Sequence, residues 1–73
     1  MADIRVRSEV AGVVARVVVA VGGSVAEGDE VIVLEAMKME LPVLAPAAGT
    51  LSAILVAEGE TVSEGQAIAT LSR

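Results

Sequence analysis

An internal repeat constrains the fold more than any other feature of this chain. A shift of 37 positions aligns residues 1–36 with residues 38–73 without a gap. Six of the seven glycines fall into three matched pairs: Gly12/Gly49, Gly22/Gly59 and Gly28/Gly65. Further matches join identical or similar apolar residues: Val6/Val43, Val19/Val56, Val25/Val62, Val31/Ile68 and Leu34/Leu71. Each copy is too short to bury a core alone, so we expect the two copies to pack around a pseudo-two-fold axis.

Both copies have the pattern of strands joined by glycine turns. Residues 4–7 alternate apolar side chains with arginines, as a half-buried strand does. The run Val13–Val21 is rich in β-branched residues, which favour strand over helix, so we expect a strand across it. Val31–Ala36 is a further apolar strand, matched by Ala67–Leu71. Short strands with turn glycines between them predict an all-β sandwich or flattened barrel.

Two kinds of residue refine this prediction. Gly28 and Gly65 each follow a glutamate in a short polar turn, and we expect both to adopt a positive φ. Pro42 and Pro46 fall in the first strand of the second copy. Because proline cannot donate a hydrogen bond to a sheet, we expect this strand to be interrupted or to lie at an edge.

The length of 73 residues leaves room for one domain, and we expect residues 1–73 to form it. The sequence contains no cysteine or histidine, so neither a disulfide nor a structural zinc site is expected to staple the fold. It also contains no aromatic residue. The core must therefore be built from valine, leucine, isoleucine and alanine.

Charge and hydropathy argue against several functional classes. Ten acidic residues against five basic ones leave no basic surface for nucleic acid. The longest apolar run, Val10–Val21, is interrupted by Arg16 and is shorter than the roughly 20 residues of a membrane span. We therefore expect a cytoplasmic protein that does not enter the membrane. No residue pattern indicates a catalytic base, an activated nucleophile, a metal site or a phosphate loop.

The junction of the two copies falls at Met37-Lys38. It must join the last strand of one half to the first strand of the other, so we expect a hairpin tip near the symmetry axis. A lysine between two apolar residues is most often an ordinary solvent-facing residue, and methionines are common as adaptable core residues. The position of Lys38 at the junction favours a functional role instead.

The run Glu35-Ala36-Met37-Lys38-Met39-Glu40 resembles the attachment motif of biotinyl domains, in which the lysine between two methionines is biotinylated. The similarity extends over essentially the whole chain, including the Val25-x-Glu27-Gly28 turn before the motif. It implies a barrel-sandwich hybrid of two four-stranded sheets, with Lys38 on a protruding hairpin. It also implies that Met37 and Met39 help partners to recognise this hairpin, and that Ala36 and Glu35 belong to the same motif.

The resemblance further implies a carrier that is not itself an enzyme. A biotin protein ligase would attach biotin to Lys38, and a biotin carboxylase would carboxylate the tethered ring. A carboxyltransferase would then pass the carboxyl group to an acceptor, for which an acyl-CoA is expected. Some biotinyl domains carry an inserted thumb near the biotin. The gap-free repeat leaves no room for one here, so we expect few contacts between protein and ring.

Two alternatives remain open from the sequence. Lipoyl domains are similar and also display a lysine, but they generally have an acidic residue before it and a small residue after it. Met37 and Met39 therefore favour biotin, with lipoate as the alternative cofactor. The other alternative is an unmodified interaction module, as in membrane-fusion adaptors, in which the Met-Lys-Met sequence would be a coincidence.

Overall fold

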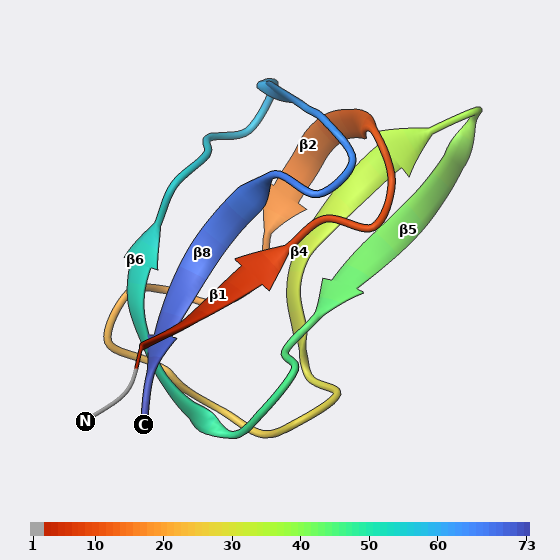
Figure 1. Ribbon diagram of the computed structural model, residues 1–73. Coiled ribbons are helices and arrows are strands. Elements are labelled where there is room, and N and C mark those ends of the chain that lie inside the picture. Colours follow the sequence, from red (N-terminus) through yellow and green to blue (C-terminus); the bar gives the residue numbers. More distant parts are fainter. Residues whose placement is uncertain (1–2) are drawn as a thin grey trace.

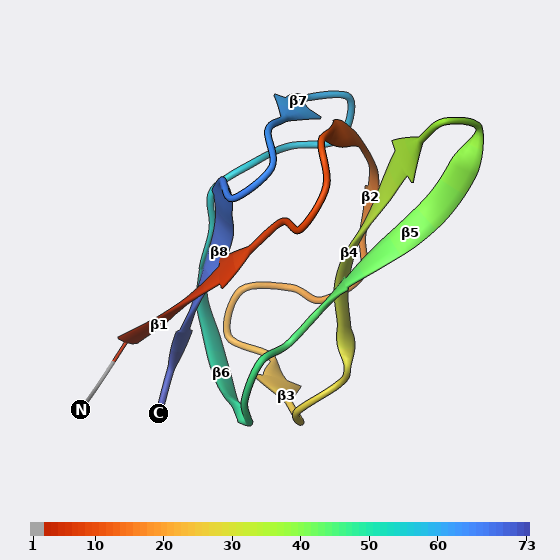
Figure 2. The ribbon, with the colours of Figure 1, turned by 45° about the vertical axis from the view of Figure 1, so that its right-hand side comes forward.

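The computed structural model describes residues 3–73, which form eight strands and no helix. The strands are β1 (Asp3–Arg7), β2 (Gly12–Val17), β3 (Ser24–Val25), β4 (Glu30–Ala36), β5 (Met39–Leu44), β6 (Gly49–Ile54), β7 (Thr61–Val62) and β8 (Ala67–Ser72). They pair into two four-stranded antiparallel sheets, in the orders β1-β8-β6-β3 and β5-β4-β2-β7. Figure 1 shows the longer strands, and Figure 2 also labels β3 and β7. The prediction of an all-β fold with two four-stranded sheets is confirmed.

The repeat in the sequence is also a repeat in the structure. The shift of 37 positions places β2 on β6 and β3 on β7 with identical bounds, and it pairs β1 with β5 and β4 with β8. Applied to the order of one sheet, the same exchange gives the order of the other. Figure 2 shows the two layers from the side. The two halves are therefore related by the expected pseudo-two-fold axis.

The space between the sheets holds an aliphatic core. Its largest fully buried side chains are those of Ile32, Leu34, Leu51, Ile68 and Leu71. The strand expected at residues 4–7 is confirmed, with Val6 buried and both arginines exposed. Ser8 is a buried polar residue, and its hydroxyl is satisfied locally because it hydrogen-bonds to both the carbonyl and the amide of Val10.

The expectation of one strand across Val13–Val21 was wrong. β2 ends at Val17, which lies opposite Ile32 of β4, and the chain then crosses to the other sheet to form β3. Val18 and Val21 lie in this crossing segment and are 48% and 60% exposed. The β-branched side chains gave the whole run strand propensity, but a strand continues only while a neighbouring strand is there to pair with it.

Hydrogen bonds from the turn glycines join the two halves. Gly28 and Gly65 have φ angles of 89° and 82°, which confirms the predicted positive φ. The amide of Gly28 donates a hydrogen bond to Ala45, and that of Gly65 donates to Ser8. Ala45 and Ser8 are themselves equivalent under the repeat, so each half receives the same bond from the other.

β5 is an edge strand, as Pro42 predicted. Pro46 lies beyond the end of β5 and does not interrupt it. Within residues 3–73 no helix is long and apolar enough to cross a membrane.

Candidate functional site

The β4–β5 hairpin contains the whole predicted attachment motif, Glu35 to Glu40. Glu35 and Ala36 end β4, Met39 begins β5, and Ala36 lies opposite Met39 in the register. Met37 and Lys38 therefore form a two-residue turn. Their φ angles of 53° and 64° are both positive, which is the requirement of a type I′ hairpin turn. The expected hairpin tip at Met37-Lys38 is present in the structure.

The tip is exposed and lies far from the C-terminus (Figure 1). Lys38 is exposed, and so are Met37 at 94% and Met39 at 59%. The two methionines are thus not core residues, although core packing is their ordinary role. In the part of the chain that the structure describes, the only ion pair joins Arg16 to Glu40, so the amine of Lys38 is not held by a carboxylate. A side chain presented in this way can enter the active site of another protein.

The base of the hairpin is anchored in the core. Residues 31–34 of β4 are all buried, although successive side chains of a strand point to opposite faces. Gly12 of β2 lies against the end of β4, where an added Cβ atom would be 2.7 Å from the carbonyl oxygen of Glu35. Glycine at this position lets β2 pass close to the base. The buried base, paired with strands on both sides, orients the tip that projects from it.

The outer face of the hairpin has an ion pair between Arg16 and Glu40 that the sequence did not predict. Glu35 and Glu40 lie opposite each other in the register, and like charges in that arrangement repel. Nη1 of Arg16, on β2, lies 3.3 Å from Oε1 of Glu40 and offsets this repulsion. In the sequence, Arg16 appeared only as the charge that interrupts an apolar run. Its partner lies 24 residues away, and only the order β5-β4-β2 brings the two together.

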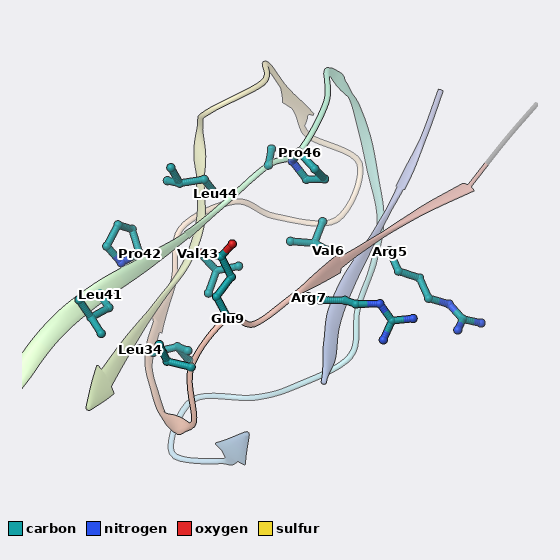
Figure 3. Close-up of a pocket in the computed structure, with 12 residues that line it drawn as sticks. Arg5, Val6, Arg7, Glu9, Leu34, Leu41, Pro42, Val43, Leu44 and Pro46 are labelled. Carbon is teal, nitrogen blue, oxygen red and sulfur yellow. The ribbon is translucent and has the colours of Figure 1, made fainter. Parts of the chain in front are cut away.

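Two grooves lie beside the hairpin. The inter-sheet groove, of about 570 Å³, runs between the edge strands β1 and β5. Figure 3 shows its residues: Val6 and Val43 lie between the strands, and the side chains of Arg5 and Arg7 extend away from β5. The hairpin groove, of about 350 Å³, is lined by Glu9, Val10, Ala11, Ala36, Met37, Met39, Leu41 and Glu64. The two grooves share Glu9, Val10 and Leu41.

Comparison with known protein families gives a match over nearly the whole chain. The family model that matches residues 2–71 is the biotin/lipoyl model, described as "Biotin-requiring enzyme". Among curated proteins, a "Biotinylated protein TB7.3 homolog" of Mycolicibacterium smegmatis is 52% identical over 40 residues. The "Biotinylated protein TB7.3" of Mycobacterium tuberculosis gives the same identity over the same length. Each match covers 55% of this chain and 56% of the relative, which is about half of either protein.

Solved structures give matches over more of the chain. The urea carboxylase of Kluyveromyces lactis matches 99% of this chain with 36% identity and a TM-score of 0.94, over 6% of its own length. A single-chain, multi-domain long-chain acyl-CoA carboxylase matches 97% with 32% identity and a TM-score of 0.89, over 7% of its length. The lipoyl domain of the 2-oxoglutarate dehydrogenase complex of Azotobacter vinelandii matches 86% with 30% identity and a TM-score of 0.71, over 80% of its length.

Proposed function

This chain belongs to the biotin/lipoyl attachment family, and on that premise we propose that it is a biotin carboxyl carrier with biotin attached to Lys38. The observation that carries the proposal is the hairpin itself: an exposed lysine between two exposed methionines, at the tip of a type I′ turn. The relatives named as biotinylated proteins support biotin as the cofactor. The two carboxylase structures support the role of carboxyl carrier.

The residues of the hairpin fit the chemistry that attachment requires. Nζ of Lys38 forms an amide with the carboxyl group of biotin, and one oxygen of that carboxyl group leaves. A biotin protein ligase uses ATP to activate the carboxyl group, so that this oxygen can be displaced. The amine must lose its proton to attack, and the ligase supplies the base, because the chain has no histidine and no carboxylate paired with Lys38 in residues 3–73. Met37 and Met39 offer the ligase apolar contacts on both sides of the amine.

Once attached, biotin accepts a carboxyl group and gives it to an acceptor. The carrier catalyses neither step. It brings the ring first to a biotin carboxylase and then to a carboxyltransferase, and the tether raises the effective concentration of the ring at both sites. We propose an acyl-CoA as the acceptor, supported by the similarity to a long-chain acyl-CoA carboxylase. Carboxylation of acetyl-CoA, propionyl-CoA and urea, with labelled bicarbonate and both partner enzymes, tests this choice; label only in urea would contradict it.

The site is tested by intact-mass spectrometry after incubation with a biotin ligase, ATP and biotin. We expect the wild type to gain the mass of one biotinyl group. Lys38→Arg keeps the positive charge but removes the acylatable amine, so we expect no gain from a chain with an unchanged circular dichroism spectrum. A variant that still gained this mass would place the attachment site at another residue.

The lipoyl domain among the matched structures makes lipoate the second candidate. The same experiment with a lipoate ligase and lipoate distinguishes the two. We expect little or no lipoylation, since Met37 and Met39 flank the lysine. Lipoylation without biotinylation would replace biotin by lipoate in this proposal. No modification by either ligase would favour an unmodified interaction module.

A further inference from the structure

The hairpin groove has two walls that come from distant parts of the chain. One wall is the hairpin itself, with Ala36, both methionines and Leu41. The other consists of residues 9–11, which connect β1 to β2, and Glu64 from the turn before β8. The volume of about 350 Å³ is at the small end of the range for small-molecule sites. The groove therefore has room for one small ring system beside the outer part of the hairpin.

Hydrogen bonds hold the second wall in place before any ligand binds. The amide of Ser8 donates to the carbonyl of Gln66, and the amide of Gly65 donates to the carbonyl of Ser8. Nη1 of Arg7 donates to the carbonyl of Gly65 at 3.0 Å. These three bonds join the segment before Glu9 to the turn that contains Glu64. The two glutamates consequently belong to one preformed surface.

The side chains that line the hairpin groove favour a ligand that is apolar and donates hydrogen bonds. The groove offers apolar contacts from Val10, Leu41 and the two methionines, together with the carboxylates of Glu9 and Glu64. None of its eight residues has a side chain that donates a hydrogen bond. A matching ligand has an apolar body and N–H donors. A bicyclic ring with a ureido group has both: a sulfur-containing apolar ring and two N–H groups.

We propose that the hairpin groove binds the ring of the biotinyl group carried on Lys38 of the same chain. The ureido N–H groups donate to Glu9 and Glu64, and the apolar ring packs on Val10 and Leu41. This inference rests on the proposed function. It gives the ring a resting position on the protein, in contrast to the few contacts that a gap-free repeat without a thumb predicts.

The tether makes this occupant more favourable than a free ligand. Leu41 is three residues from Lys38 along β5, a span of about 10 Å for an extended strand. A lysine side chain joined to a valeryl chain exceeds this length, so the ring reaches the groove without distortion of the hairpin. Because the ring is attached, weak contacts suffice to hold it for part of the time. A lipoyl dithiolane ring has no N–H donors and would not satisfy the two carboxylates.

The test compares the biotinylated domain with the unmodified domain by ¹⁵N–¹H NMR. Intact mass first establishes that biotin is attached. We expect amide shifts across the groove, in residues 9–11 and 64–66, and nuclear Overhauser effects between ring protons and the methyl groups of Leu41. Shifts confined to residues 36–39, in a domain shown to be biotinylated, would overturn the inference and leave the proposed function intact. No gain of mass would overturn both.

A second measurement uses the rate at which streptavidin captures the biotinylated domain. A docked ring must leave the groove before capture, so the rate follows the undocked fraction. We expect the double variant Glu9→Gln/Glu64→Gln to be captured faster, because its hydrogen bonds to the ureido group lose charge assistance. A rise of about twofold corresponds to a ring that is docked about half of the time in the wild type.

The matched control is Glu30→Gln/Glu58→Gln, which removes the same charge from two exposed positions outside the groove. We expect its capture rate to equal that of the wild type. Equal rates for the wild type and both double variants would overturn the inference. An equal rise in both would assign the effect to net charge and overturn it as well. Circular dichroism spectra of the three proteins confirm that they are folded.

Discussion

At the scale of single residues, backbone conformation separates the Met37-Lys38 turn from the glycine turns. Four glycines have positive φ, and in all four an added Cβ atom would meet nothing within 4 Å. Met37 and Lys38 are the described residues other than glycine with positive φ. Left-handed backbone in such residues costs of order 1–3 kcal/mol and is often found at functional sites. The Met37-Lys38 turn thus keeps side chains at two positions where the backbone conformation alone would favour glycine.

A pair of substitutions tests the turn glycines. Gly28→Val and Gly65→Val place a β-branched residue at φ angles of 89° and 82°, and each should lower the free energy of unfolding by about 1–3 kcal/mol. Thermal melts followed by circular dichroism measure the change. Glu27→Val adds the same side chain next to Gly28, at an exposed position without positive φ, and should cost much less. Equal losses in all three variants would contradict the role of backbone conformation.

At the scale of elements, the β4–β5 hairpin combines a buried base with an unfavourable tip. The base is stabilised by the buried strand β4 between β5 and β2. The tip has Met37 and Lys38 where type I′ turns prefer Asn-Gly. Stability of the tip and the proposed recognition by a ligase therefore make different demands on residue 37, and a substitution there should separate them.

Met37→Asn should stabilise the domain and impair its modification. Asparagine tolerates left-handed backbone better than methionine, so we expect a gain of up to about 1 kcal/mol. In a domain of this size, 1 kcal/mol shifts the melting temperature by about 4–8 °C. We expect slower biotinylation by a ligase, since an apolar contact beside Lys38 is lost. Met39→Asn, outside the turn, should slow biotinylation without the gain in stability. A lower melting temperature for Met37→Asn would contradict this account of the turn.

The ion pair on the outer face gives an asymmetric prediction. Arg16→Gln leaves Glu35 and Glu40 opposite each other without compensation, whereas Glu40→Gln removes the repulsion together with the ion pair. Arg16→Gln should therefore be the more destabilising change, although both should stay below about 1 kcal/mol because the pair is exposed. Urea unfolding at low and high salt measures both, and salt should reduce the difference. A larger loss for Glu40→Gln would show that repulsion between the glutamates is negligible.

At the scale of the whole molecule, the pseudo-two-fold axis makes each half depend on the other. The amide of Gly22 donates to Leu51 in the second half, and the amide of the equivalent Gly59 donates to Val14 in the first. Both halves also contribute equivalent side chains to one core, including Leu34 and Leu71. The domain should therefore unfold as a single cooperative unit.

Equivalent core substitutions should thus have similar effects. Leu34→Ala and Leu71→Ala each remove a fully buried side chain, and each should cost about 2–5 kcal/mol. Urea unfolding measures this against a total stability that, at about 0.05–0.15 kcal/mol per residue, is itself small. Leu55→Ala, at a position 49% exposed, serves as the control and should cost far less. Separate unfolding transitions for the two halves would contradict the single cooperative unit.

Much of the fold and of the site could be predicted from the sequence because the repeat carried the information. The matched glycines located the turns, the shift located the junction at Met37-Lys38, and Pro42 marked the edge strand. Each of these features can be read from a residue and its immediate neighbours in the chain. A glycine permits a positive φ, and a proline lacks the N–H that a central strand needs. The chemical role of Lys38 came from the motif around it and remains a proposal.

Other features were decided only by tertiary structure, because they depend on which strands become neighbours. β2 ends at Val17 because the chain then crosses to the other sheet, although the apolar run continues to Val21. Arg16 meets Glu40 because β4 lies between β2 and β5. The hairpin groove exists because the turn with Glu64 packs beside residues 9–11. The sequence by itself determined the repeat, the turns and the displayed lysine, whereas packing between distant segments determined the surface that surrounds this lysine.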